Sequence, residues 1–219
     1  MPRYLTSEEK QRKRSLILNN AVEMFDHMLF REITMSKLAK KCKIAKGTIF
    51  KYFDTKETLF SFILYSEYDN WVDEEKFALS RFDTFTKQQF IDFTRKRTHD
   101  IFANHPRLVR LTSMKRVILD KNINTELYAK LAQKFSCQMR EIAKIAASKI
   151  PGASEEEMFE FYEAWHMAVV GSYNLGISRE NMRKIEEAGI GDIHAIDVEK
   201  SALRSVTYYI KGIFCKKEN

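Results

Sequence analysis

Apolar residues recur at helical spacing along most of the 219-residue chain, and this pattern predicts an all-α protein. Only 7 Gly and 3 Pro interrupt it, which leaves few sites where a helix must break. We expect about nine helices, spanning approximately residues 7–27, 34–42, 45–52, 54 to beyond 71, 87–103, 106–119, 124–149, 154–176 and 197–215. Three of them should begin with a capping box, at the pairs Thr6/Glu9, Asp54/Glu57 and Ser154/Glu157.

Two short amphipathic segments lie close together between Thr34 and Phe53. Thr34 is placed to cap the first, whose apolar positions 35, 38, 39 and 42 share one face. The period breaks at Lys43 and Ile44 and resumes with Ile49, Phe50 and Phe53, which indicates a tight turn and a second short helix. Two short helices joined by a turn predict a helix-turn-helix unit.

The second of these helices carries cations and hydroxyls away from its apolar contact. Such groups suit phosphate oxygens and base edges, so we expect this unit to bind duplex DNA. Gly47 would let the helix approach closely, and Thr34, Ser36 and Lys56 would hold the DNA backbone. The full set of expected DNA-binding residues is Thr34, Ser36, Lys46, Gly47, Thr48, Lys51, Tyr52 and Lys56.

The charge of the chain is concentrated in its first quarter. Residues 1–56 hold 13 Lys and Arg against 6 Asp and Glu, which accounts for the whole net charge of +7. A basic N-terminal segment followed by a chain without net charge is typical of a nucleic-acid-binding domain attached to a domain with another task. A Lys-rich surface that serves only solubility is the alternative, but it does not predict this segregation.

The run from Leu38 to Phe60, LAKKCKIAKGTIFKYFDTKETLF, resembles the TetR family of transcriptional regulators. It departs from the family pattern in three places: Lys43 replaces the usual turn glycine, Ala45 the usual serine and Phe50 the usual tyrosine. A Lys in a left-handed turn and an Ala at an N-cap each cost about 1 kcal/mol. The resemblance implies a DNA-binding domain at residues 1–54 and a helical effector-binding and dimerisation domain at 55–219.

A chain of this kind is expected to be a ligand-responsive transcriptional regulator, with repression as the expected mode. It would bind near-palindromic operator DNA as a homodimer and be released by a small, largely apolar effector. A second hypothesis stays open: a helix-turn-helix protein without an effector, acting architecturally or through a protein partner.

The last two long helices carry more apolar surface than a monomer needs to bury, which favours a partner. In proteins that this sequence resembles, these helices form a four-helix dimer interface. Small residues on the first helix would permit close approach. The expected interface residues are Ala168, Gly171, Ser172, Val206, Ile210 and Ile213, with His166 as a packed or interface histidine.

Aromatic and methionine side chains in the body are candidates for lining an effector site, although such residues more often form ordinary core. Arg97 falls near the centre of an apolar face, where it pairs with a carboxylate, extends its charged end to solvent, or meets an anionic end of the effector. The candidate lining residues are Phe93, Arg97, Met114, Phe135, Met139 and Trp165.

Motifs for catalysis and for metal binding are missing from the sequence. We find no Gly-rich phosphate loop, no nucleophile elbow and no His-Glu-x-x-His, so we expect neither an enzyme nor a cofactor. The three cysteines lack metal-ligand spacing and are expected to be small core residues. Without a long apolar run or a signal-like N-terminus, we expect a cytoplasmic protein that does not enter membranes.

Overall fold

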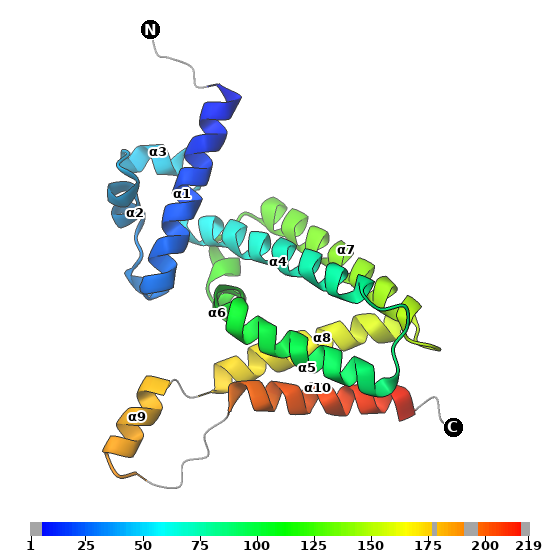
Figure 1. The fold of residues 1–219 in the computed structure, drawn as a ribbon. Helices are drawn as coiled ribbons and strands as arrows, with labels where there is room; N and C mark the ends of the chain where they lie inside the picture. The colour runs from blue at the N-terminus through cyan, green and yellow to red at the C-terminus, as the bar shows by residue number, and fades with distance from the viewer. Residues whose placement is uncertain (1–5, 177–178, 191–196, 216–219) are drawn as a thin grey trace. The chain divides into compact units, whose positions relative to one another are not determined.

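The computed structural model describes residues 6–176, 179–190 and 197–215 (Figure 1). Every regular element in these residues is a helix, which confirms the all-α prediction. The Cα positions divide the chain into two compact units. Unit 1 comprises residues 1–66 and 114–131, and unit 2 comprises 67–113 and 132–219. The division differs from the expected boundary at residue 54 because two long helices contribute residues to both units.

Unit 1 is a small helical cluster around an apolar centre. Phe60 lies at this centre, with its ring centroid 5.3 Å from that of Phe25 and 5.1 Å from that of Phe30. The capping box of Thr6 and Glu9 is formed, so the first helix begins where the sequence predicts. The elements of unit 1 are α1 (Ser7–His27), η1 (Phe30–Glu32), α2 (Met35–Cys42), α3 (Lys46–Phe50), the start of α4 (Lys56–Ser80), η2 (Leu119–Asn122) and the start of α7 (Thr125–Lys149).

Two local details of unit 1 differ from the prediction. The fourth helix is capped by Thr55 and not by Asp54: the Thr55 hydroxyl accepts a hydrogen bond of 2.9 Å from the backbone N–H of Thr58. The cap therefore lies one residue later, because a threonine hydroxyl reaches the third helical N–H as well as a carboxylate does. Helix α3 is shorter than expected, and its remaining residues form a turn that leads to Thr55.

Unit 2 is built from longer helices. They are most of α4 and α7, together with α5 (Lys87–Asn104), α6 (Pro106–Met114), α8 (Glu155–Leu175), α9 (Arg179–Glu187) and α10 (Val198–Cys215). The sequence pattern had not singled out α9, whose residues are mostly polar, and α6 ends earlier than expected. Thr86 and Ser154 both form capping boxes at the starts of α5 and α8.

The core of unit 2 is rich in aromatic rings. Phe90 of α5 and Phe161 of α8 lie 5.0 Å apart between ring centroids, and Phe85 contacts Phe90 at 5.6 Å. Helix α10 packs along both α5 and α8, as Figure 1 shows. The backbone N–H of Phe85 donates to the carbonyl oxygen of Lys149 at 2.7 Å, which ties the segment before α5 to the end of α7.

Candidate functional site

The segment from Thr34 to Phe53 forms two short helices joined by a turn. The Thr34 hydroxyl accepts from the backbone N–H of Lys37 at 3.2 Å and caps α2. At its other end, Lys43 adopts left-handed backbone angles, with φ 54° and ψ 40°. Ala45 precedes α3 without a side-chain cap. The structure thus places two of the three departures from the family pattern, Lys43 and Ala45, at the strained and uncapped positions that the sequence predicts.

The buried face of α3 holds this pair of helices together. Ile49 is fully buried and Phe53 nearly so, while Lys46, Gly47 and Lys51 are exposed. Thr48 and Tyr52 are half-buried, and Thr34 and Ser36 before and within α2 are exposed. A side chain added at Gly47 would meet no other atom within 4 Å, so packing does not require a glycine there. The open surface at Gly47 leaves room for a partner to approach the backbone of α3.

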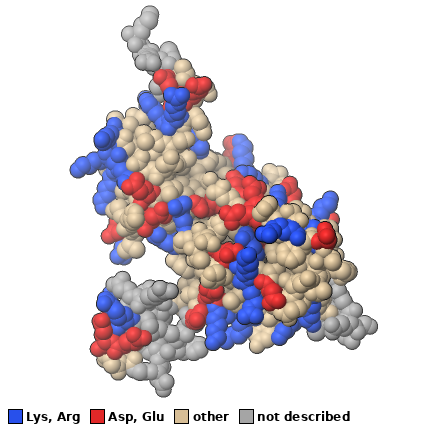
Figure 2. All heavy atoms as spheres, in the orientation of Figure 1, with Lys and Arg blue, Asp and Glu red and all other residues tan. Residues whose placement is uncertain are grey.

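Lysines crowd the surface around α2 and α3. Lys40, Lys41, Lys43, Lys46 and Lys51 are all exposed, and Figure 2 shows blue atoms gathered where Figure 1 places these helices. Lys41 also contacts Glu23, with 2.6 Å between its Nζ and the Oε1 of the carboxylate. The other lysines provide a positive surface suited to phosphates.

Lys56 is held by its own unit. Its Nζ donates to the carbonyl oxygens of Phe30 at 2.9 Å and of Ile33 at 3.0 Å, and it lies 3.9 Å from the centre of the Phe30 ring. Burial lowers the pKa of this ammonium group below its ordinary value. Two of its three N–H groups are therefore occupied in anchoring the segment before α2, a structural task that the sequence did not reveal.

Phe50 was not among the predicted DNA-binding residues, yet it is exposed on α3. Its side chain is 41% exposed, and the Lys46 ammonium lies 5.7 Å from the centre of its ring. A large apolar ring on the same surface as the cations provides a contact for a methyl group. The sequence contained a signal, since adjacent helical residues point about 100° apart and a narrow buried stripe that holds Ile49 leaves Phe50 outside it.

In unit 2 the six candidate effector residues fall in different places. Met139 and Trp165 line a cavity of about 40 Å³, and Phe135 lines a more open pocket of about 340 Å³ next to it. Phe93 and Arg97 lie elsewhere, at a groove beside α4 and α5. Met114 belongs to unit 1 and lines neither the cavity nor the adjacent pocket. The six candidate residues therefore do not line one common space.

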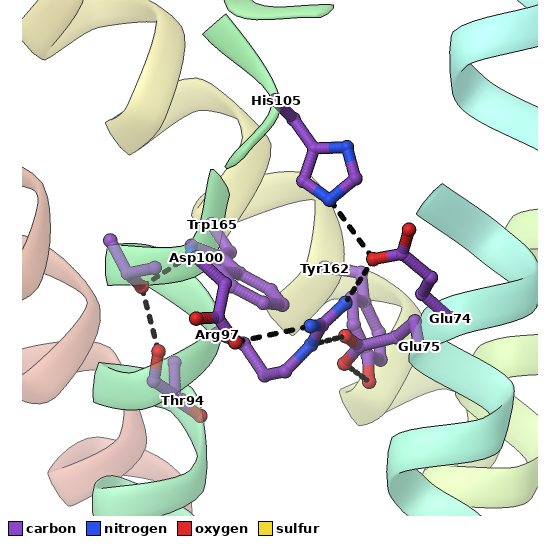
Figure 3. Close-up of polar contacts among 9 residues, drawn as sticks. Glu74, Glu75, Thr94, Arg97, Asp100, His105, Tyr162 and Trp165 are labelled. Atoms are coloured by element: carbon purple, nitrogen blue, oxygen red, sulfur yellow. Dashed lines mark hydrogen bonds and ion pairs between the residues drawn. The ribbon is translucent and has the colours of Figure 1, made fainter. Parts of the chain in front are cut away.

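Arg97 is buried in a network of polar side chains from three helices (Figure 3). Its Nε donates to Glu75 Oε2 at 2.7 Å and its Nη1 to Asp100 Oδ2 at 3.3 Å. Glu75 is fully buried and also accepts from the Tyr162 hydroxyl at 3.0 Å. Burial raises the pKa of Glu75 above its ordinary value, although Arg97 opposes this effect. The alternative in which Arg97 pairs with a carboxylate is confirmed.

Three of the predicted dimer-interface residues face the interior of unit 2. Val206, Ile210 and Ile213 are 3%, 1% and 7% exposed, because α10 packs on α5 and α8. A second chain could not touch these side chains without unpacking the helix, so assigning them to the interface was a mistake. Ala168, Gly171 and Ser172 of α8 are partly exposed. The large exposed apolar side chains of these two helices are instead Met167, Tyr173, Leu175 and Tyr208.

The two cysteines whose side chains the structure describes differ in burial. Cys42 is buried, and burial raises the pKa of its thiol, whereas Cys137 is exposed, contrary to the expected core position. The Cys215 side chain lies outside the described part of the structure. Among the described residues, His, Cys, Asp and Glu form no group that could hold a metal ion. None of the described helices combines the length and apolar character needed to cross a bilayer.

Comparisons with known proteins place the chain in a family. Residues 17–62 match the family "Bacterial regulatory proteins, tetR family", and residues 66–217 match "Tetracyclin repressor-like, C-terminal domain". The HTH-type transcriptional regulator UidR of Escherichia coli K12 is 31% identical over 108 residues, which are 47% of this chain and 52% of UidR. The chain thus spans about half the length of the curated relatives it matches.

Solved structures share the fold. The fatty acid degradation regulator FadR from Bacillus halodurans has a TM-score of 0.53 at 14% identity, covering 96% of this chain and 98% of its own. A TetR transcriptional regulator from Rhodococcus sp. RHA1 has a TM-score of 0.51 at 16% identity, covering 91% and 97%. The family consists of DNA-binding regulators and not of enzymes, and its models match both parts of the chain. This chain is a member of the TetR family of transcriptional regulators.

Proposed function

We propose that this protein represses transcription by binding near-palindromic operator DNA as a homodimer, and that a small, largely apolar effector releases it. One observation carries the proposal most directly. Lys46 and Gly47 at the start of α3 and Lys51 directly after it are exposed, while Ile49 is buried, in a segment that matches the DNA-binding domain of the family. Exposed cations and an open backbone at a short helix suit the major groove.

In this proposal α3 enters the major groove, with Lys46 and Lys51 near base edges and phosphates. Thr48 and Tyr52 offer hydroxyls at the margin of the same surface, and Thr34 and Ser36 lie exposed near the start of α2. Lys56 keeps its place through the Phe30 and Ile33 carbonyls, so we assign it a supporting role, with its remaining N–H available for a phosphate.

Dimerisation would use the outer faces of α8 and α10. Met167 and Tyr208 are 65% and 66% exposed, and partly exposed Gly171 and Ala168 would allow close helix approach. A two-fold dimer would place its two helix-turn-helix units in successive major grooves, about 34–36 Å or a multiple of this distance apart. Covering these apolar side chains supplies part of the driving force.

The effector would bind inside unit 2, where the cavity of about 40 Å³ adjoins the pocket of about 340 Å³. Helix α4 contributes residues to both units, so it is our candidate for carrying the effect of the ligand to the DNA-binding part. The alternative regulator without an effector also has an observation in its favour. A cavity of about 40 Å³ is far smaller than the roughly 300 Å³ or more of ordinary ligand sites.

The experiment begins by selecting duplexes from a random DNA library with the 219-residue chain. We expect a near-palindromic sequence that binds about 10³-fold or more tightly than a scrambled duplex, with strong salt dependence. Equal affinity for selected and scrambled DNA would refute operator recognition. Compounds that raise the melting temperature are then titrated against the operator complex. A coupling free energy of about 1–3 kcal/mol between effector and DNA binding would weaken operator binding about 5- to 150-fold. Stabilising compounds that leave operator affinity unchanged would favour the regulator without an effector.

A further inference from the structure

Trp71 on α4 carries a hydrogen-bond donor that the protein does not use. The residue is 7% exposed, and its Nε1 is buried without a hydrogen-bond partner. The neighbouring Trp165 shows the usual arrangement, since its Nε1 donates to the Thr98 hydroxyl at 2.9 Å. A buried donor without a partner costs about 1–3 kcal/mol. A bound molecule that supplies a hydrogen-bond acceptor to the Trp71 indole would remove this cost.

Trp71 lines the cavity of about 40 Å³ inside unit 2. This volume has room for only a few water molecules. The walls are mostly aliphatic and aromatic side chains from α4, α5, α6, α7 and α8. A hydroxyl pair also lines the cavity, with 3.0 Å between the oxygens of Tyr68 and Thr112. An acceptor atom can be received here, but a whole effector needs more space than the closed cavity provides.

The additional space lies directly beside the cavity, in the pocket of about 340 Å³ between α7 and α8. Met139, Tyr162 and His166 line both spaces, so these side chains form the wall between them. Phe135 belongs to the same wall: its ring lies 4.2 Å from that of Tyr68 and 6.4 Å from that of His166. His166 is exposed and Phe135 partly exposed, so rotation of these two side chains would join the two spaces.

The charges around the two spaces restrict the chemistry of a ligand. None of the described residues that line them is Lys or Arg, and the one carboxylate among them is Glu163. Arg97 lines neither space and is engaged by Glu75 and Asp100. Arg140, whose guanidinium lies 4.6 Å from the centre of the Phe159 ring at the outer pocket, is paired with Glu156. An anionic group placed beside Trp71 would lose its hydration, and the cavity wall has no Lys or Arg to act as its countercharge. The anionic end considered from the sequence is therefore unsuitable.

We propose that the effector is an uncharged, elongated apolar molecule whose hydrogen-bond acceptor, such as a carbonyl oxygen, receives the Trp71 N–H. It enters between α7 and α8, displaces Phe135 and His166, and leaves its apolar remainder in the outer pocket. This inference rests on the proposed function and names the chemical class of the effector.

The two tryptophans of the chain, Trp71 and Trp165, both line the cavity, so intrinsic tryptophan emission reports on this site alone. The probes are methyl heptyl ketone and nonanoate, which have equal carbon numbers but differ in charge. We expect the ketone to change the emission saturably and to raise the melting temperature. Nonanoate at neutral pH should bind at least about tenfold more weakly, because its charge must be desolvated.

The variant Trp71→Phe removes the donor while keeping an aromatic ring, and Trp165 remains as the reporter. We expect it to fold with undiminished stability and to bind the ketone about three- to tenfold more weakly, as for one lost hydrogen bond. Phe77→Ala, which removes an exposed ring away from both spaces, is the matched control and should leave ketone binding unchanged.

Equal binding of ketone and nonanoate, or full ketone affinity in Trp71→Phe, overturns the inference. Absence of ketone binding to the unmodified protein also overturns it and leaves water as the partner of the indole. Operator binding by the same preparations separates the two proposals. A protein that binds its selected operator but not the ketone refutes only the effector class, whereas loss of sequence preference for DNA refutes the proposed function.

Discussion

Arg97 and Glu75 form an ion pair in the interior of unit 2, with 2.7 Å between Arg97 Nε and Glu75 Oε2. The Glu75 side chain is fully buried, and that of Arg97 is 9% exposed. The pair joins α5 to α4, and the Tyr162 hydroxyl attaches it to α8. Ion pairs of this kind fix how helices align but make the fold sensitive to the loss of either partner.

Replacing Arg97 by Met should lower the free energy of unfolding by about 3–5 kcal/mol, because Glu75 would remain buried and charged without its partner. Urea denaturation at about pH 7 measures the change. Lys130→Met, which breaks an exposed pair with Glu126 on α7, is the control and should change stability by less than about 0.5 kcal/mol. Similar effects of the two substitutions would contradict a structural role for the buried pair.

The loss in Arg97→Met should depend on pH. Burial already raises the pKa of Glu75 above 4.5, and the substitution removes the guanidinium that opposes this. A carboxyl group with a raised folded pKa binds more protons in the folded state, so stability falls as pH rises from its unfolded to its folded pKa. We expect the deficit to shrink as pH is lowered from about 7 towards 4.5. In the double variant that also carries Glu75→Gln, the loss of stability should not depend on pH. If the loss of stability in Arg97→Met itself does not change with pH, the role given to Glu75 is refuted.

Lys51→Ala should weaken operator binding and reduce the slope of log affinity against log salt by about 0.9, the value for one phosphate contact. Lys144→Ala removes an exposed lysine of α7, so this control variant has the same net charge as Lys51→Ala. It should leave the salt slope unchanged. Lys56→Ala should instead lower the melting temperature, since it frees the carbonyls of Phe30 and Ile33. A salt slope unaffected by Lys51→Ala would remove that residue from the interface.

If α3 lies in the major groove, the exposed ring of Phe50 can contact a thymine methyl group. Deoxyuridine lacks this methyl, so replacing the contacted thymine should weaken binding about fourfold, from about 0.8 kcal/mol for a buried group of this size. In Phe50→Ala the same replacement should have no effect. A deoxyuridine scan of the operator, performed on both proteins by gel shift, identifies the position. An equal loss for both proteins would mean that Phe50 does not contact the base.

Met167→Glu should give a folded monomer with reduced operator affinity, because this exposed side chain of α8 lies on the proposed dimer surface. Sedimentation and circular dichroism measure assembly and folding. Phe77→Glu, at an equally exposed apolar residue on α4, is the control and should remain a dimer. Val206→Glu should unfold unit 2, because Val206 is 3% exposed within one chain. A dimeric Met167→Glu protein would exclude this surface.

Much of the fold was predictable because helix formation depends on residues close in sequence. The spacing of apolar positions located the helices, Thr34 was correctly identified as the cap of α2, and the strained position of Lys43 followed from the family pattern. The exposure of Lys51 was predictable for the same reason, because it lies two residues after buried Ile49 and so points away from it at helical spacing, whereas Lys46 is exposed as the first residue of α3.

The partners of these residues were decided only by the tertiary structure. Periodicity shows that Val206, Ile210 and Ile213 share an apolar face, but it cannot tell whether a second chain or the chain's own α5 and α8 cover that face. Arg97 meets Glu75 from 22 residues earlier, and Lys56 meets carbonyls more than 20 residues away. The unpaired Trp71 indole likewise emerges only from packing. Local sequence determines which surfaces exist, whereas long-range contacts determine what each surface touches, because burial depends on elements far apart along the chain.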